Sequence, residues 1–339
     1  MRTCKSFAIP AAIAAISLGL TVAVRAETYT VIDVPGAKDT EAAAIDNAGV
    51  IVGNYDDSAG NGHGFIRAAD GTLTFIDIAH SVLTSPDAIN AKGWIVGWYW
   101  DTAKIAHGFI RKPDGHIQTV DSGTGQDLVF QHINRHDETA GFFLDASFVH
   151  HGFLRARNGT MTVVDPPGAT YTDIGGLTDT GDVAGTFRDG AGKYHGYVRS
   201  AAGVYTPFDV PGAKSTDAYS IANGGAVTGA YADSDGYHGF VRDSLGNFTL
   251  FDIKHGRKLD AAITGAIINR RGDVAGHYTF GLGDRSFLRN PRGGMKFIDP
   301  PGADEADPFI YVNGMNNKRA TVGEFLGTDQ KVHGFLREP

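Results

Sequence analysis

One pentapeptide, HGFIR or a close variant of it, recurs along the whole chain at an almost constant spacing. Its last residue is an arginine, and successive arginines are separated by 44, 44, 44, 43, 47 and 48 residues: Arg67, Arg111, Arg155, Arg199, Arg242, Arg289 and Arg337. A period of roughly 40–50 residues is typical of β-propellers, in which each unit is a four-stranded blade. The repeat therefore outweighs the length of 339 residues, which alone would suggest two domains.

One unit can be divided into four short strands joined by turns. The strands are AAID (43–46), VIVGNYD (50–56), HGFIR (63–67) and TLTFID (72–77), and the connecting segments are rich in Gly, Asn and Asp. Residues of this kind favour tight turns, whereas no long stretch has the periodicity of an amphipathic helix. The sequence therefore predicts an all-β fold built from repeated hairpins.

The two ends of the chain complement each other. The last unit stops at HGFLREP without a fourth strand, whereas ETYTVID (27–33) reads as a fourth strand with no unit before it. We expect the N-terminal strand to complete the last blade, because closing the ring removes exposed strand edges. The prediction is a single domain over residues 27–339, a seven-bladed β-propeller closed by this pairing.

The repeating unit also resembles a known family. FDVPGAKSTDAYSIANG (208–224) and HGFIRAADGTLTFID (63–77) are similar to the HAF-type extracellular repeats of bacteria, and the resemblance covers residues 27–339. It implies an exported bacterial β-propeller. It brings no defined activity, so it assigns no catalytic residue.

The first 26 residues are expected to be a secretory signal peptide. Arg2 and Lys5 precede an apolar run over 7–24, and small residues end it. A membrane anchor is the competing interpretation, but the run is short for a span and contains Pro10. We therefore expect an exported protein, in the periplasm or the medium, with no membrane span in the mature chain.

Composition narrows the range of partners. The one cysteine, Cys4, lies in the predicted leader, so the mature chain does not rely on disulfides. Without the leader, 27 Lys and Arg residues face 38 Asp and Glu residues, which gives a net charge of −11. No basic stripe is present, so neither nucleic acid nor an anionic membrane is an expected partner. The sequence leaves the oligomeric state open.

The recurring histidine has a structural and a functional interpretation. His63 begins the third strand and Asp77 ends the fourth, so the hairpin places the two side chains opposite each other. The same spacing joins His107 to Asp121 and His238 to Asp252. A ring of metal-binding histidines is the alternative, but residues one blade apart are too distant to share an ion at about 2.0–2.1 Å. We therefore expect structural pairs, and no metal or cofactor.

The second and third units depart from the repeat, and function is expected where copies differ. Neither unit is preceded by the PGA turn found elsewhere, and Trp98 and Trp100 alternate with Tyr99 in the second unit. Alternation places both indoles on one face of a strand, where they can stack on a sugar ring. A packed interface between blades is the alternative.

Three further polar residues fall in or beside the divergent segments. Asp87 and His132 lie on or next to the inner strands of adjacent units, where they can form an acid–base pair near the channel or simply line a solvated wall. His150 precedes the repeated His151 and points to the other face of its strand, so it is a candidate ligand-binding residue.

These features predict a binding module for an extracellular carbohydrate, protein or envelope component. The alternative is an enzyme, a polysaccharide lyase or glycoside hydrolase, with its site at the mouth of the axial channel. His132 and Asp87 would then carry the chemistry, and Trp98 and Trp100 would form a sugar platform. A purely structural envelope protein is the third possibility.

Overall fold

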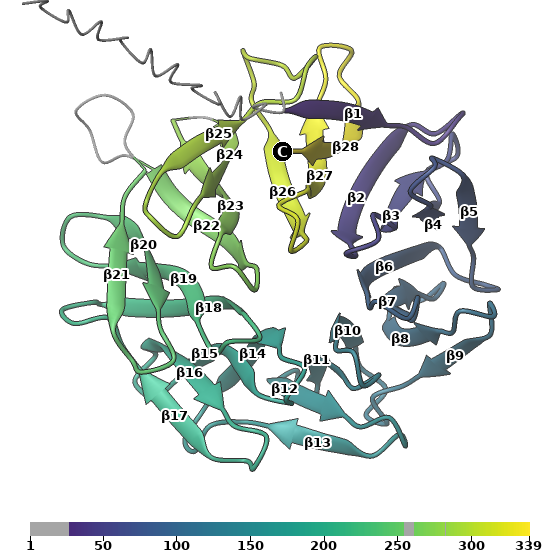
Figure 1. Cartoon of the computed structure of the whole chain (residues 1–339). Helices are drawn as coiled ribbons and strands as arrows, with labels where there is room; N and C mark the ends of the chain where they lie inside the picture. Colours follow the sequence, from purple (N-terminus) through teal and green to yellow (C-terminus); the bar gives the residue numbers. More distant parts are fainter. Residues whose placement is uncertain (1–26, 254–260, 282) are drawn as a thin grey trace, which may run out of the picture.

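The described part of the chain forms a ring of short β-strands around a central axis (Figure 1). The computed structural model describes residues 27–253, 261–281 and 283–339. The predicted leader, residues 1–26, lies outside them. None of the helices in the described ranges is long and apolar enough to cross a membrane. The repeated antiparallel hairpins make this an all-β propeller, as the sequence predicts.

The strands nearest the axis begin each unit. These inner strands are β2 (Asp39–Ile45), β6 (Leu83–Ile89), β10 (Leu128–Ile133), β14 (Tyr171–Leu177), β18 (Ser215–Ile221), β22 (Ala261–Ile268) and β26 (Ile310–Met315). The second strands are β3 (Ile51–Asp56), β7 (Ile95–Trp100), β11 (Thr139–Leu144), β15 (Val183–Arg188), β19 (Val227–Ala232), β23 (Val274–Phe280) and β27 (Thr321–Leu326).

The third strands contain the repeated pentapeptide. They are β4 (Gly62–Arg67), β8 (Ala106–Arg111), β12 (His150–Arg155), β16 (Tyr194–Arg199), β20 (Tyr237–Arg242), β24 (Gly283–Arg289) and β28 (Val332–Glu338). The outermost strands are β5 (Leu73–Ile76), β9 (Ile117–Val120), β13 (Met161–Val164), β17 (Tyr205–Phe208), β21 (Phe248–Phe251), β25 (Met295–Ile298) and β1 (Thr28–Ile32).

The predicted number of blades is wrong. In the described ranges there are five separate four-stranded blades, not seven, and strands β2 to β9 form one eight-stranded sheet. The two units in that sheet are joined by a parallel contact between Gly62 of β4 and Leu83 of β6. Gly62 has no side chain, and a Cβ there would lie 2.1 Å from Leu83 Cδ1, so only glycine permits this approach. The segment before β6 also lacks the PGA turn, and its Val82 carbonyl accepts a hydrogen bond from the Gly62 N–H at 3.1 Å.

The ring closes through the pairing that the chain ends predict. β1 runs antiparallel to β28, with Thr28 opposite Glu338 and Ile32 opposite Gly334. Glu27 strengthens this joint, because its Oε1 accepts hydrogen bonds at 2.6 Å from Arg337 Nη2 and from Lys296 Nζ of the neighbouring blade. The N-terminal strand therefore belongs to the last blade, next to β28 in Figure 1.

The core lies between adjacent sheets. The aromatic residue of each pentapeptide is fully buried there: Phe65, Phe109, Phe153, Tyr197, Phe240, Phe287 and Phe335. Burying an aromatic side chain of this size contributes about 1.5–3 kcal/mol, so this one repeated position supplies much of the cohesion of the ring. Its periodic recurrence explains why the pentapeptide is repeated.

The repeated histidine forms a three-residue cluster that we call the Asp–His–Asp triplet. In the first unit His63 Nδ1 lies 2.7 Å from Asp77 Oδ1, and His63 Nε2 lies 3.4 Å from Asp57 Oδ2. The imidazole also stacks on Tyr55, with ring centroids 5.1 Å apart. The same arrangement surrounds His107, His151, His195, His238 and His333.

Each triplet ties the end of a hairpin to the loop before it. Burial alone would lower the pKa of His63, but the hydrogen bonds and charges of Asp77 and Asp57 outweigh it and raise that pKa. Asp57 in turn accepts N–H groups from its own loop, at 2.8 Å from Ala59 and 2.9 Å from Asn61. The cluster is thus internally satisfied, and the geometry favours an architectural role for this histidine.

Candidate functional site

Equivalent positions of the inner strands are chemically different, and the differences point to a site. Each of the seven inner strands described above carries a β-bulge, one extra residue near its middle, and a bulge redirects the side chains beside it. One position of the inner strand varies among the units. It lies opposite the residue that follows the repeated glycine of the second strand, and it is occupied by Glu41, Ser85, Val129, Asp173, Asp217, Gly265 and Tyr311. An acidic residue occupies this position in the first, fourth and fifth units.

A pocket of about 450 Å³ opens where the third, fourth and fifth units meet. We call it the tyrosine pocket, because Tyr171, Tyr194 and Tyr219 line it together with Asp173 and Asp217. The remaining lining residues are Gln131, His132, Ile174, Gly175, Thr186 and Ala218. Tyr171 begins β14, so the pocket lies at the end of the channel where inner strands start.

The two aspartates in the pocket are half-buried and have no cationic partner in the part of the chain that the structure describes. Burial raises the pKa of Asp217 to about 6. Burial also raises the pKa of Asp173, although nearby His150 and His132 oppose the shift. Among the described residues, neither carboxylate forms an ion pair with Lys, Arg or His. Buried carboxyl groups of this kind are poised to accept hydrogen bonds from a ligand or to hold a proton.

Two histidines flank Asp173 from the third unit. His132 Nε2–H donates to the Ile174 carbonyl at 3.0 Å, and His150 Nδ1–H donates to the Thr172 carbonyl at 2.7 Å. Burial is the largest influence on both imidazoles and lowers the pKa of each. Both rings are therefore neutral near pH 7, and each retains one unprotonated nitrogen.

A row of stacked aromatic rings leads from the third unit to the pocket. The His150 ring stacks on Phe142 at 4.1 Å and on Tyr171 at 4.5 Å, and Tyr171 meets Tyr194 edge to face at 6.2 Å. Burial, followed by the charge of Asp173, raises the pKa of Tyr171 to about 12, and burial also raises the pKa of Tyr219. The phenols keep their protons, so they offer apolar faces and hydrogen-bond donors together.

The structure does not pair Asp87 with His132 within the described residues. Asp87 Oδ1 accepts a hydrogen bond from Ser85 Oγ at 2.9 Å. Burial raises the pKa of Asp87 to about 7, against the hydrogen bonds from Ser85 and Trp98. His132 instead lines the tyrosine pocket, where the charged group acting on it is Asp173. An acid–base role for Asp87 with His132 therefore remains a prediction without a shared contact.

The two tryptophans form a pair of their own in the second unit. Trp98 and Trp100 meet edge to face, with ring centroids 5.2 Å apart, and Trp100 is 37 % exposed. Neither residue lines the tyrosine pocket. His150 does not line the pocket either, but its ring stacks on Tyr171, which does.

A second cluster of acids lies at the joint between the last and first units. Burial, followed by the charge of Glu41, raises the pKa of Glu324 to about 8. Tyr311 is the cross-strand partner of Glu324, and its hydroxyl donates a hydrogen bond to Asp284 Oδ2. The other oxygen of that carboxylate, Asp284 Oδ1, accepts a hydrogen bond from the Thr279 hydroxyl at 2.6 Å. Repeat comparison could have found this cluster, because Glu occupies position 324 where the other units have Asn, Trp, Phe, Thr, Ala or His.

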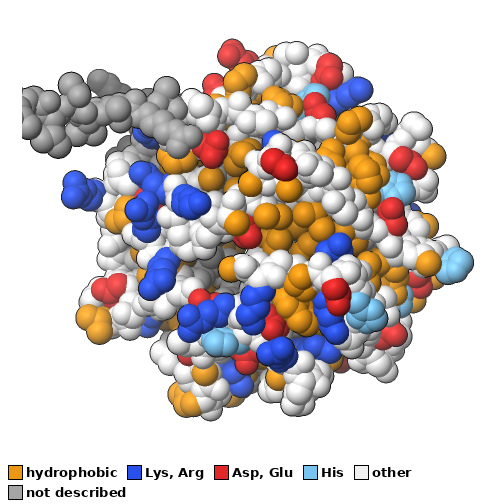
Figure 2. Space-filling model, turned by 45° about the vertical axis from the view of Figure 1, so that its right-hand side comes forward, with side chains coloured by type: hydrophobic (Ala, Val, Ile, Leu, Met, Phe, Trp, Pro, Cys, Tyr) orange, Lys and Arg blue, Asp and Glu red, His pale blue; other side chains and the backbone are white. Residues whose placement is uncertain are grey.

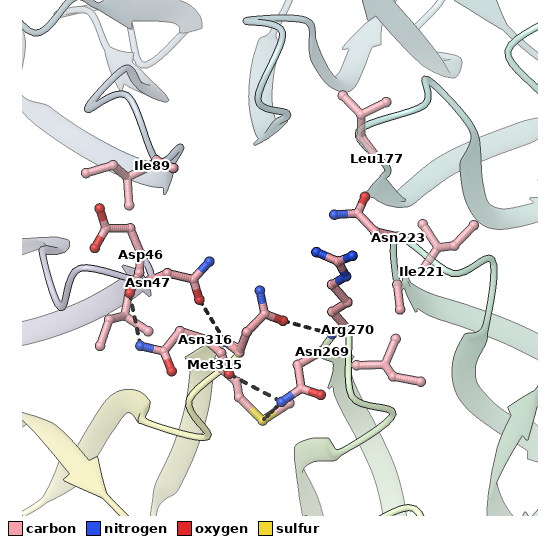
Figure 3. Close-up of a pocket in the computed structure, with 15 residues that line it drawn as sticks. Asp46, Asn47, Ile89, Leu177, Ile221, Asn223, Asn269, Arg270, Met315 and Asn316 are labelled. Atoms are coloured by element: carbon pink, nitrogen blue, oxygen red, sulfur yellow. Dashed lines mark hydrogen bonds between the residues drawn. The ribbon is translucent and has the colours of Figure 1, made fainter.

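At the other end of the channel, turns that follow the inner strands surround a second cavity (Figure 3). This cavity of about 210 Å³ is also lined by branched aliphatic residues such as Ile45 and Leu177. At the rim, the Arg270 N–H donates to Asn317 Oδ1 at 2.9 Å and the Asn317 N–H donates to Asn47 Oδ1 at 3.0 Å. These bonds link one unit to the next, so the rim is part of the ring's architecture.

No candidate metal centre is found in the described residues, because no group of three or more His, Cys, Asp or Glu side chains is placed to hold an ion. The triplets contain suitable ligand types, but their nitrogen and oxygen atoms are bonded to one another. Their geometry accounts for these groups without an ion.

Comparison with known proteins identifies the class of the fold. No protein-family model matches the sequence, and no curated protein matches it. Virginiamycin B lyase from Staphylococcus aureus has a similar solved structure, with TM-score 0.59 and 12 % identity over 92 % of this chain and 99 % of that chain. The β-propeller domain of the Trilobed protease from Pyrococcus furiosus has TM-score 0.61 and 10 % identity over 88 % and 95 %. At such identities the likeness shows the fold alone, a β-propeller.

Proposed function

We propose that this chain is an exported binding module that takes up an extracellular carbohydrate in the tyrosine pocket. The observation that carries the proposal is the combination of three tyrosines with two half-buried aspartates that lack a cationic partner among the described residues. The leader-like segment 1–26 and the resemblance to HAF-type repeats support export. The pocket, not the tryptophan pair, is the site on which we base the proposal.

The chemistry of the pocket fits an uncharged sugar. Tyrosine rings pack against the C–H face of a pyranose, and carboxylates accept hydrogen bonds from its hydroxyl groups. None of the described residues lining the pocket is Lys or Arg, so a uronate carboxylate would meet two aspartates without a neutralising charge. This arrangement favours neutral glycans and weighs against a polysaccharide lyase, which must stabilise a substrate carboxylate.

Isothermal titration of the mature protein with neutral and uronate-containing oligosaccharides tests the proposal. We expect neutral oligosaccharides to bind, with affinity reduced about tenfold or more in Tyr171→Ala and in Asp217→Asn. Phe148→Ala is the matched control, because Phe148 is 68 % exposed and does not line the pocket. Equal affinity in all three variants, or preference for uronates, would refute the assignment.

Glycoside hydrolysis is a second candidate, favoured by one observation. The pKa of Asp217, about 6, keeps part of this carboxyl group protonated near neutral pH, as a general acid requires. Asp173 in the same pocket would act as the second carboxyl group. Product analysis in the same titrations decides between the two functions: sugar released by the wild type but not by Asp217→Asn establishes an enzyme, whereas binding without product establishes a binding module.

A further inference from the structure

The turns of the sixth and seventh units carry a local excess of positive charge. Five cationic residues occur there: Arg270, Arg271, Arg292, Lys318 and Arg319. The acidic residue among them is Asp273, whereas the whole chain has a formal net charge of −8. Lys and Arg side chains gather on one face of the molecule in Figure 2. Like charges held close together repel one another, so such a concentration on an acidic protein favours an anionic partner.

Three of these arginines surround one pocket. Arg271, Arg292 and Arg319 line a pocket of about 350 Å³ together with Asp273, Asn290 and Pro291. We call it the arginine pocket. Asp273 is 3 % exposed, and its Oδ1 lies 3.2 Å from Arg319 Nε. One carboxylate thus offsets one of three guanidinium groups, and the pocket retains a positive charge.

The backbone that carries the arginines is held in place. The Arg271 N–H donates to Asn269 Oδ1 at 2.9 Å, and the Arg292 N–H donates to Asn290 Oδ1 at 2.9 Å. The two turns also pack together, because a Cβ on Gly272 would lie 3.5 Å from the Pro291 ring. A preorganised backbone reduces the entropy lost when the side chains bind a ligand.

The guanidinium groups of Arg271 and Arg292 are available for binding. Within residues 27–253, 261–281 and 283–339, neither side chain makes a hydrogen bond or an ion pair with another side chain or carbonyl. Arg289 of the same unit differs, because it is buried and its Nη1 donates to the Asn290 carbonyl at 3.4 Å. A planar guanidinium presents parallel donors that match the oxygen atoms of a phosphate or carboxylate.

We propose that the arginine pocket binds an oxyanion group, a phosphate or a carboxylate, carried by an anionic ligand. The pocket volume exceeds that of a single oxyanion, so it also has room for part of the molecule that bears the group. The tyrosine pocket lies where the inner strands begin, whereas the arginine pocket is formed by turns at the opposite end of the units. The two sites are therefore independent, and either can exist without the other.

Titration of the mature protein with inorganic phosphate and with acetate, at constant ionic strength, tests this site. We expect millimolar or tighter binding, followed by NMR or calorimetry, and an affinity loss of about fivefold to tenfold in Arg271→Gln and in Arg292→Gln. Arg157→Gln is the matched control. Arg157 is also an exposed arginine in an outer turn, in the third unit, and its removal changes the net charge equally.

The relative affinities identify the group that is bound, since tighter binding of phosphate or of acetate names the chemistry directly. Arg292→Lys keeps the charge but not the planar donors, so we expect it to lose part of the affinity. An equal loss in Arg157→Gln would show a general charge effect and overturn the proposal. Failure of both anions to bind the wild type, with thermal melting confirming that it is folded, would also overturn it.

Discussion

The Asp–His–Asp triplets and the tyrosine pocket both contain Asp and His side chains, but the pKa values of these groups are shifted in opposite directions. In the triplet of the first unit, two carboxylates raise the pKa of His63. In the pocket, burial lowers the pKa of His132 and raises the pKa of Asp217. The difference is one of partners: each charge in a triplet faces its opposite, whereas the half-buried acids of the pocket have no cationic partner among the described residues. Repeated positions therefore stabilise the ring, and departures from the repeat leave groups free for a ligand.

The largest expected effect tests the triplet side of this comparison. His238 is 7 % exposed and lies 2.7 Å from Asp252 and 3.1 Å from Asp233. We expect His238→Ala to lower the free energy of unfolding by about 2–3 kcal/mol at pH 6, because two carboxylates lose their partner. Denaturant unfolding measures this loss.

His116→Ala provides the control for that experiment. His116 is an exposed turn residue that is held by its backbone: its N–H donates to Asp114 Oδ1 at 2.9 Å, and its carbonyl accepts from the Lys112 N–H at 2.8 Å. We expect its replacement to change stability by less than about 0.5 kcal/mol. Equal losses in the two variants would mean that the triplets contribute nothing specific to the ring.

A smaller effect, of opposite sign, is expected in the pocket. Asp217→Asn should raise the free energy of unfolding by about 1 kcal/mol at pH 8, because it removes a buried charge without a partner. Asp252→Asn, in a triplet, should lower it. Unfolding of both variants at pH 8 checks the contrast, and destabilisation by both would remove the distinction between pocket and triplet.

The pH dependence follows from the same pKa shifts. Because the folded pKa of Asp217 is about 6, above the ordinary value of 3.8, its favourable contribution is complete at low pH and is lost as the pH rises through 6. His238, with a raised pKa, likewise stabilises below about pH 6.5, and Asp233, with a lowered pKa, stabilises above about pH 4. Stability should therefore peak between about pH 4 and 6.5. Asp217→Asn should remove the loss of stability that this carboxyl group causes between about pH 4 and 6, because above pH 6 it is ionised in the folded and the unfolded state alike.

The sequence was sufficient for most of the architecture because the repeat is periodic. A buried aromatic, a hairpin and a His–Asp spacing that recur in register specify the strand order, and the unmatched strand at 27–33 specifies how the ring closes. The number of separate blades could not be read in the same way. It depends on one parallel contact, between Gly62 and Leu83, that the period does not encode.

The candidate site was harder to predict for a physical reason. Asp173, Asp217 and the pocket tyrosines lie in units that keep the PGA turn, so the loss of that turn, which singled out the second and third units, did not point to them. Their proximity arises from the curvature of the ring, which brings inner strands of three units to one pocket. Comparing the residue before each inner-strand bulge would have revealed the acids, but the bulges are visible only in the structure.

The smallest expected effect tests whether the tryptophans belong to the site. Trp94, Trp98 and Trp100 all lie in the second unit, and none lines the tyrosine pocket. A neutral oligosaccharide bound between Tyr171 and Tyr219 should therefore leave tryptophan fluorescence almost unchanged while calorimetry reports heat. A saturable fluorescence shift that disappears in Trp100→Phe, yet persists in Tyr171→Ala, would move the binding site to the second unit. In that case the exposed indole of Trp100, and not Asp173 and Asp217, would form the ligand-binding site of this propeller.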